Sequence, residues 1–192
     1  MLIPAGLAAI PTISLDTNDD ISLTINSVSM SGDARVSNPD NNTLVNVGSV
    51  SGSGYDLALG GGNHIGFTGA VTVDELIVGG TISGAAAAGN ATFQAGSSLT
   101  ANTVTVGRDG QAGTLNMRTV FSGTPAINLY SGATVNVYAP STFGTNAISM
   151  SSNTTSTDGG RVQLINDTDG TAFGGNFTVA SGLRGIFKVD LA

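Results

Sequence analysis

The acidic residues are the side chains of this sequence best suited to chemistry, and several of them occur as close pairs. Two carboxyl groups are what glycoside cleavage requires, one as acid and the other as nucleophile or base. The pairs are Asp19 with Asp20, Asp74 with Glu75, and Asp167 with Asp169. Enzymes that act on carbohydrates also place aromatic platforms beside such acids, whereas this chain has no Trp and only three scattered Tyr. We therefore interpret the pairs as solvated turns and expect a protein that is not an enzyme.

His64 is the only histidine, so a Ser-His-Asp triad or a His-centred acid–base site would have to use it. It lies in the glycine-rich stretch Gly62-Asn63-His64-Ile65, and no Gly-x-Ser-x-Gly sequence stands between a strand-like and a helix-like segment. We interpret His64 as a histidine of a surface turn. A metal site built on His could use only this one ligand, and the absence of Cys excludes thiolate sites.

The segment Asp16-Thr-Asn18-Asp-Asp20 has oxygen ligands at alternate positions, as at the start of a calcium-binding loop. Ile21 replaces the glycine that an EF-hand needs, and Ser27 replaces its final glutamate, so an EF-hand is excluded. Asp16, Asn18 and Asp20 remain a weak candidate site for a structural Ca²⁺ at extracellular calcium concentrations. No other cofactor is expected.

The composition excludes several classes of protein. The 192 residues include 6 Lys and Arg against 13 Asp and Glu, for a net charge of −7, and only 10% of residues are charged. So few cations cannot form a basic track along phosphates, which excludes a nucleic-acid partner. No apolar segment is long enough to span a bilayer, so we expect no membrane span. The hydrophobic content of 40% is sufficient for a folded core.

Short segments that alternate apolar and polar residues run through the chain, as in a strand with one buried face. Clusters of Gly, Asn and Asp separate them and indicate turns. Examples of the segments are Ile21–Ile25, Thr103–Val106, Thr114–Met117, Ile127–Leu129, Val135–Val137 and Arg161–Leu164. No window has the apolar periodicity of a helix, so the chain is predicted to be all-β.

A corner signature recurs between these strands. Phe93-Gln-Ala-Gly96-Ser-Ser-Leu99 has the same form as Leu129-Tyr-Ser-Gly132-Ala-Thr-Val135, and Val179-Ala-Ser-Gly182 repeats its first half. Glycine permits a positive φ at such a corner, after which the next strand re-enters with an apolar residue facing inward. This pattern favours a right-handed parallel β-helix over the alternative, an antiparallel β-sandwich or jelly roll. We expect residues 1–20 to form an N-terminal extended arm and residues 21–192 a single solenoid domain.

The stretch from about Val71 to Val137 resembles the β-helical passenger regions of bacterial autotransporters and related exported surface proteins. The residues that carry the resemblance are Ala95–Ala101, Val104–Gly107 and Gly113–Asn116. The resemblance implies a right-handed parallel β-helix displayed at the surface of a Gram-negative cell. The expected localisation is therefore extracellular or at the cell surface, with a virion as the alternative.

Both ends of the sequence contain strand-like apolar segments with few charges to protect an edge. Such segments favour stacking of copies end to end, and contacts that do not close produce filaments. The residues expected to form these contacts are Leu2, Ile3, Ile13, Leu15, Phe187, Val189 and Leu191.

From these observations we predict a non-enzymatic, self-associating surface protein. It would be a subunit of an extracellular filament or layer, or a passenger-like adhesin segment, and would form homo-oligomers through its terminal strands. The alternatives are a phage or virion fibre, decoration or capsid protein and, third, a carbohydrate-active β-helix enzyme. Surface glycans are left open as partners.

Overall fold

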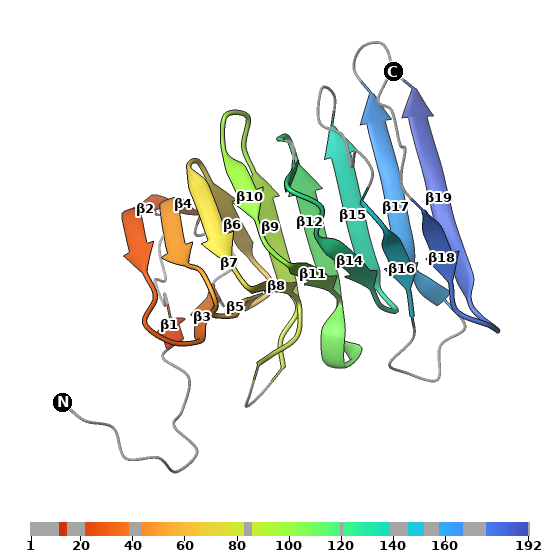
Figure 1. The fold of residues 1–192 in the computed structure, drawn as a ribbon, viewed down its shortest axis with the longest axis horizontal. Helices are drawn as coiled ribbons and strands as arrows, with labels where there is room; N and C mark the ends of the chain where they lie inside the picture. Colours follow the sequence, from red (N-terminus) through yellow and green to blue (C-terminus); the bar gives the residue numbers. More distant parts are fainter. Residues whose placement is uncertain are drawn as a thin grey trace.

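A computed structural model describes residues 12–14, 22–38, 44–82, 86–119, 121–138, 146–151, 158–166 and 176–191. All the strand pairs found in these ranges are parallel. The chain winds as a right-handed parallel β-helix, seen from the side in Figure 1. The predicted fold class is therefore confirmed, and the antiparallel sandwich is excluded.

One sheet, which we call sheet A, takes one strand from each coil. Its eight strands, in spatial order, are β1 (Thr12–Ser14), β3 (Ala34–Ser37), β5 (Leu57–Gly60), β8 (Glu75–Val78), β11 (Thr103–Val106), β14 (Ala126–Leu129), β16 (Ile148–Met150) and β18 (Phe177–Val179). Strand β1 lies within the segment expected to be an N-terminal arm, and it pairs in parallel with β3.

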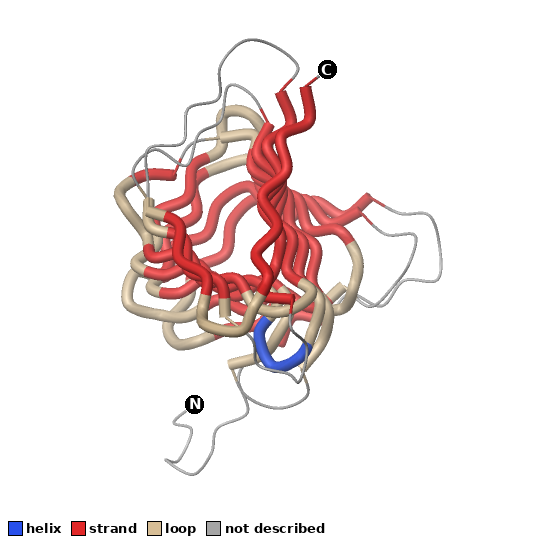
Figure 2. The backbone as a smooth tube through the Cα atoms, turned by 90° about the vertical axis from the view of Figure 1, so that its right-hand side faces the viewer, coloured by secondary structure: helices blue, strands red, loops and turns tan. Residues whose placement is uncertain are grey.

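The second sheet branches at the long strand β4 (Leu44–Gly52), because β6 pairs with its first half and β7 with its second half. The branch through β6, which we call face B1, continues along β6 (His64–Phe67), β9 (Gly89–Phe93), β12 (Gly113–Met117), β15 (Ala133–Tyr138), β17 (Asp158–Asn166) and β19 (Arg184–Leu191). The other branch, face B2, contains β7 (Ala70–Val73), β10 (Ser98–Thr100) and β13 (Phe121–Ser122). Strand β2 (Ser22–Ser29) pairs along both halves of β4. Figure 2 shows the sheets enclosing one interior.

The glycine corners have the geometry that the sequence predicts, but they mark two different corners of the coil. Gly96, with φ of 86°, joins face B1 to face B2, whereas Gly132 and Gly182, both with φ of 82°, join sheet A to face B1. The recurring signature is therefore not a repeat of the coil itself. The coils differ in length, from 19 residues between Leu59 and Val78 to 29 between Met150 and Val179.

The interior is filled by ladders of aliphatic side chains, because in-register parallel strands stack equivalent residues on one another. In sheet A one such ladder is Val36–Leu59–Val78–Val106–Leu129–Met150, in which every side chain is at most 3% exposed. On face B1 Phe67 and Phe93 occupy neighbouring rungs and stack with ring centroids 4.8 Å apart. One continuous hydrophobic core therefore runs along the coils.

Helical structure in the described ranges amounts to a single 3₁₀ turn, Arg108–Gly110, at a corner between sheet A and face B1. Within those ranges there is thus no helix with the length and apolarity to cross a bilayer.

Candidate functional site

The C-terminal end of the solenoid exposes apolar side chains. Among the described residues no strand pairs with the outer edge of β19 or β18. Phe187 is 45% exposed, although its neighbour in the ladder, Val162, is fully buried. Phe187 contacts Phe177 of β18 edge to face, with centroids 6.0 Å apart, so the two sheets meet across the interior at this end. The last coil therefore presents the hydrophobic core at an open end.

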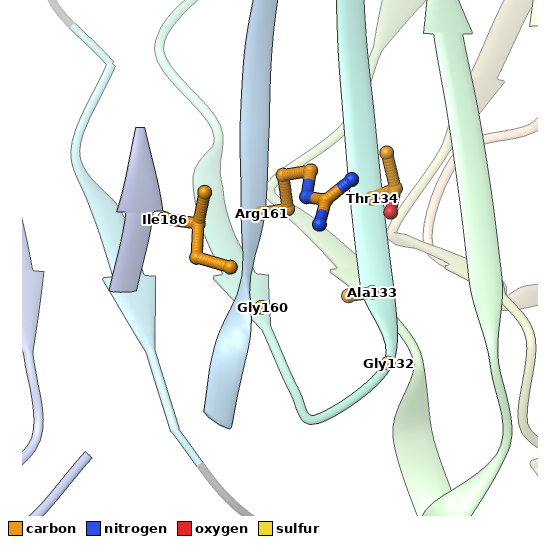
Figure 3. Close-up of a pocket in the computed structure, with 6 residues that line it drawn as sticks. All are labelled: Gly132, Ala133, Thr134, Gly160, Arg161 and Ile186. Atoms are coloured by element: carbon orange, nitrogen blue, oxygen red, sulfur yellow. The ribbon is translucent and has the colours of Figure 1, made fainter. Parts of the chain in front are cut away.

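Ile186, which precedes Phe187, points to the outside of face B1 and is 40% exposed. With Arg161 and Thr134 it lines a hollow of about 260 Å³ whose other lining residues are Gly132, Ala133 and Gly160. Figure 3 shows Arg161 extending across β15 toward Thr134, away from Ile186. The apolar surface at this end thus continues from the core edge onto the outer face.

The N-terminal end of the solenoid carries the complementary edge. Strand β2 has eight residues, and its burial alternates so that Leu23, Ile25 and Val28 are half-buried while Ser22, Thr24 and Ser29 are exposed. Ile25 and Val28 lie next to β4 and pack against the hydrophobic core. Both ends of the solenoid therefore have an eight-residue strand at the edge of face B1.

The residues predicted to form assembly contacts are only partly placed. Phe187 is an exposed residue of β19, and Val189 and Leu191 belong to the same strand. The backbone of Ile13 pairs in β1 with Val36. Leu2, Ile3 and Leu15 lie outside the described residues.

Sequence reasoning missed other residues of the two ends, namely Phe177, Val179, Ile186 and the inward row of β2. The alternation in residues 21–25 predicted the strand, but which strand lies at an end depends on the strand order, and that cannot be inferred from alternation alone.

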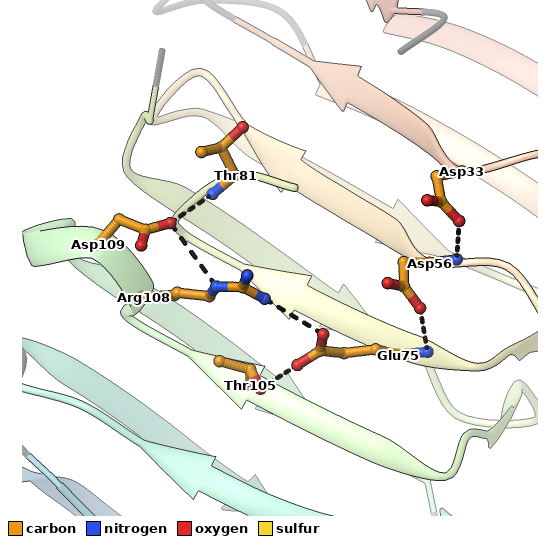
Figure 4. A network of polar contacts seen from close by, with 7 residues as sticks. All are labelled: Asp33, Asp56, Glu75, Thr81, Thr105, Arg108 and Asp109. Atoms are coloured by element: carbon orange, nitrogen blue, oxygen red, sulfur yellow. Dashed lines mark hydrogen bonds and ion pairs between the residues drawn. The ribbon is translucent and has the colours of Figure 1, made fainter. Parts of the chain in front are cut away.

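Asp74 and Glu75 lie at the corner that leads into sheet A, where both bind residues of the next coil. Figure 4 shows Glu75 with its partners Thr105 and Arg108. Asp74 accepts a hydrogen bond of 2.6 Å from the Asn102 amide, which lies outside the residues drawn. Glu75 accepts a hydrogen bond from the Thr105 hydroxyl and, at 3.2 Å, pairs with the Arg108 guanidinium. The two carboxylates thus link neighbouring coils.

The carboxylates of this corner form a ladder along the solenoid axis, which we call the acidic ladder: Asp33, Asp56 and Glu75. Asp33 accepts the backbone N–H of Asp56 at 3.0 Å, and Asp56 accepts that of Glu75 at 3.2 Å. Burial raises the pKa of Asp56, and the neighbouring charges of Asp33 and Glu75 raise it further. The ladder therefore joins coils through hydrogen bonds while it brings like charges together.

The remaining candidates from the sequence lie elsewhere. The carboxylate pairs Asp19 with Asp20 and Asp167 with Asp169 are outside the described residues, as are the calcium candidates Asp16, Asn18 and Asp20. In the ranges that the structure does describe, no three His, Cys, Asp or Glu side chains come together as metal ligands.

His64 begins β6 and points outward from face B1, so the prediction that it lies in a surface turn is wrong. Burial lowers its pKa below the ordinary value of 6.5, although a hydrogen bond with Asn90 opposes the shift. His64 lines a polar hollow of about 280 Å³ with five residues of neighbouring coils. These are Thr92, Gln94, Asn116, Arg118 and Tyr138. The hollow escaped sequence reasoning because its members are spread over 75 positions in the sequence, His64 to Tyr138.

Comparison with known proteins gave no match to a protein family, to a curated protein or to a solved structure.

Proposed function

We propose that the protein is a structural, non-enzymatic β-solenoid that assembles head to tail, with the last coil of one copy stacked on the first coil of the next. The observation that carries this proposal is the exposure of the core at β19. Phe187 belongs to the inward row but is 45% exposed, and exposing its ring to water costs free energy of folding. One more strand stacked on β19 would bury the ring.

The ladders define the register of such a stack. Following the pairing from β2 to β19 along face B1, Phe187 is the eighth member of the row that begins with Leu23. A second copy would therefore place its Leu23 on Phe187 and its Thr24 beside Lys188. In sheet A the same continuation places Ile13 of the second copy beside Val179. Both sheets thus extend in one common register.

Charge also favours contact between unlike ends. Residues 1–38 contain four aspartates and one cation, Arg35, whereas residues 177–192 contain Arg184 and Lys188 with the single acid Asp190. A net negative first segment and a net positive last segment favour head-to-tail contact over contact between two N-terminal ends. Because such contacts are non-closing, the product is a filament and not a ring.

The setting we propose is extracellular, as a filament or layer subunit or as an adhesin segment at a bacterial cell surface. It is supported by the resemblance of residues 71–137 to autotransporter passenger regions. The second candidate, a virion fibre or capsid protein, would use the same stacked contacts.

The experiment is sedimentation velocity with electron microscopy of the purified chain over a range of concentrations. Phe187→Asp introduces a charge into the proposed contact, and Tyr55→Asp is the matched control, because Tyr55 is an exposed aromatic residue of the turn before β5. We expect filaments for the unchanged protein and for Tyr55→Asp, and monomers for Phe187→Asp. Dispersed monomers of the unchanged protein at every concentration, or equal behaviour of the two variants, would overturn the proposal.

A further inference from the structure

The polar hollow beside His64 is a built feature of face B1. Its lining residues come from four consecutive strands, and each points outward because it alternates with a buried neighbour. His64 is on β6, Thr92 is on β9 with Gln94 just after it, Asn116 is on β12 with Arg118 just after it, and Tyr138 ends β15. The hollow runs across the strands, along the solenoid axis.

Among the described residues, the outward positions of these four strands carry no carboxylate, although the chain has 13 acidic residues. The outward residues of β6, β9, β12 and β15 are His, Gly, Asn, Thr and Tyr, and Gln94 and Arg118 follow in the same rows. The described acids near these coils lie instead at the corners next to sheet A, among them Asp56, Asp74, Glu75 and Asp109. Arg118, the one cation among the described lining residues, thus has no carboxylate at the outward positions of the four strands around it.

Arg118 is held in place by an aromatic ring. Its guanidinium carbon lies 4.2 Å from the ring centroid of Tyr138, a cation–π contact that leaves the in-plane N–H donors to point elsewhere. Arg118 remains exposed to solvent. A fixed, exposed guanidinium presents a fork of donors that matches a carboxylate in geometry.

The neutral groups of the hollow are ordered by a ladder of amides. Asn136 donates to the Asn116 carbonyl oxygen at 2.8 Å, and Asn116 in turn donates to the Asn90 oxygen at 3.4 Å and the Thr92 hydroxyl at 3.2 Å. His64 is hydrogen-bonded to Asn90, and its lowered pKa leaves it neutral at pH 7. The hollow therefore offers one positive charge beside several neutral donors and acceptors in fixed positions.

We propose that this hollow binds a segment of acidic glycan, with Arg118 bound to the carboxylate of a uronic acid and the amide, hydroxyl and imidazole groups bound to sugar hydroxyls. A sugar acid combines one carboxylate with several hydroxyls, and the described lining likewise combines one cation with several neutral polar groups. The volume of about 280 Å³ is at the small end for ligand pockets, which suits one or two sugar units of a chain that runs along the coils.

The test is calorimetry of the whole chain with a trisaccharide of galacturonic acid, with a neutral maltotriose as the second arm. Arg118→Gln is compared with Arg161→Gln, which removes the same charge from the same face but outside the hollow. We expect uronate binding that Arg118→Gln weakens at least tenfold and Arg161→Gln less than threefold, with no binding of maltotriose. Tyr138→Leu, which keeps the cation but removes its support, should also weaken binding.

Three results would overturn the proposal. They are no uronate binding at millimolar concentration, equal binding of the neutral sugar, and equal losses in Arg118→Gln and Arg161→Gln. Circular dichroism and urea unfolding of each variant show whether it is folded, and if Arg118→Gln unfolds, the comparison between Tyr138→Leu and Arg161→Gln decides in its place.

Discussion

At the scale of single residues, the acidic ladder couples the stability of the solenoid to pH. Because burial and the charges of Asp33 and Glu75 raise the pKa of Asp56 above 3.8, the folded protein retains a proton that the unfolded chain has already released. Stability contributed by this group is therefore lost as the pH rises through the interval just above 3.8, and the loss persists at neutral pH.

Asp56→Asn should accordingly raise the free energy of unfolding at pH 7, by up to about 1 kcal/mol for a partly exposed group. The Asn oxygen can still accept the Glu75 N–H, while the repulsion disappears. Urea unfolding of both proteins from pH 3 to pH 8 measures the difference, which should shrink toward zero below the folded pKa. A variant that is less stable than the parent at pH 7 would contradict this account of the ladder.

Substitutions at two corner glycines distinguish the free-energy cost of backbone strain from that of a steric clash. Both Gly96 and Gly79 have positive φ, but an added Cβ at Gly96 meets no atom within 4 Å, whereas at Gly79 it would lie 2.2 Å from the Ala112 carbonyl oxygen. We expect Gly96→Ala to lower the free energy of unfolding by about 1 kcal/mol and Gly79→Ala by about 3 kcal/mol or more. Equal losses in urea unfolding would show that the close approach of the two coils is not maintained.

Single residues also show the limit of sequence reasoning. The pair Asp74 and Glu75 was found as a candidate, but the partners that engage it, Asn102 and Thr105, lie 28 and 30 residues further on. These partners are determined by how neighbouring coils align, and the sequence around Asp74 and Glu75 does not indicate that alignment. His64 was assigned to a turn because of its glycine neighbours, although Gly66 is buried within the same strand.

At the scale of elements, the stacked ladders are the main source of stability. Phe93 is fully buried, packs on Phe67 and lies between coils above and below. Phe93→Ala should cost about 3–5 kcal/mol, because the rungs cannot collapse into the cavity without breaking their pairing. Phe121→Ala is the matched control, because Phe121 is half-buried in the two-residue strand β13. This change should lower the free energy of unfolding by about 1–2 kcal/mol. Thermal or urea unfolding measures both, and a similar cost at the two sites would argue against a rigid ladder.

Elements were more predictable than their arrangement. Alternation indicated strands such as those at 103–106 and 133–138, and the positive φ at Gly96, Gly132 and Gly182 follows from the corner signature. The branching of the second sheet at β4 was not predictable, because a single nine-residue strand serves two faces and its central Gly48 does not have the positive φ of the corner glycines. Because the coils differ in length, the sequence also shows no fixed repeat period.

At the scale of the whole molecule, the account predicts that assembly depends on ionic strength. Since the first coils are acidic and the last contain Arg184 and Lys188, salt should weaken the attraction between unlike ends. Light scattering during assembly at low and high NaCl measures the rate, which we expect to fall several-fold as salt increases. Faster assembly in high salt would indicate that apolar contact alone brings the ends together.

The absence of cysteine allows the head-to-tail register to be tested directly. Within one copy Thr24 and Lys188 lie at opposite ends of the solenoid, about 33 Å apart, because seven strand spacings separate them. In the proposed stack the two residues of different copies are neighbours, within the range that a disulfide can bridge. The double variant Thr24→Cys with Lys188→Cys should therefore form oligomer ladders on a non-reducing gel after mild oxidation. The control, Ser29→Cys with Lys188→Cys, is displaced along the strand by more than about 15 Å and should remain a single band. Ladders from both pairs, or from neither, would contradict end-to-end continuation of the solenoid.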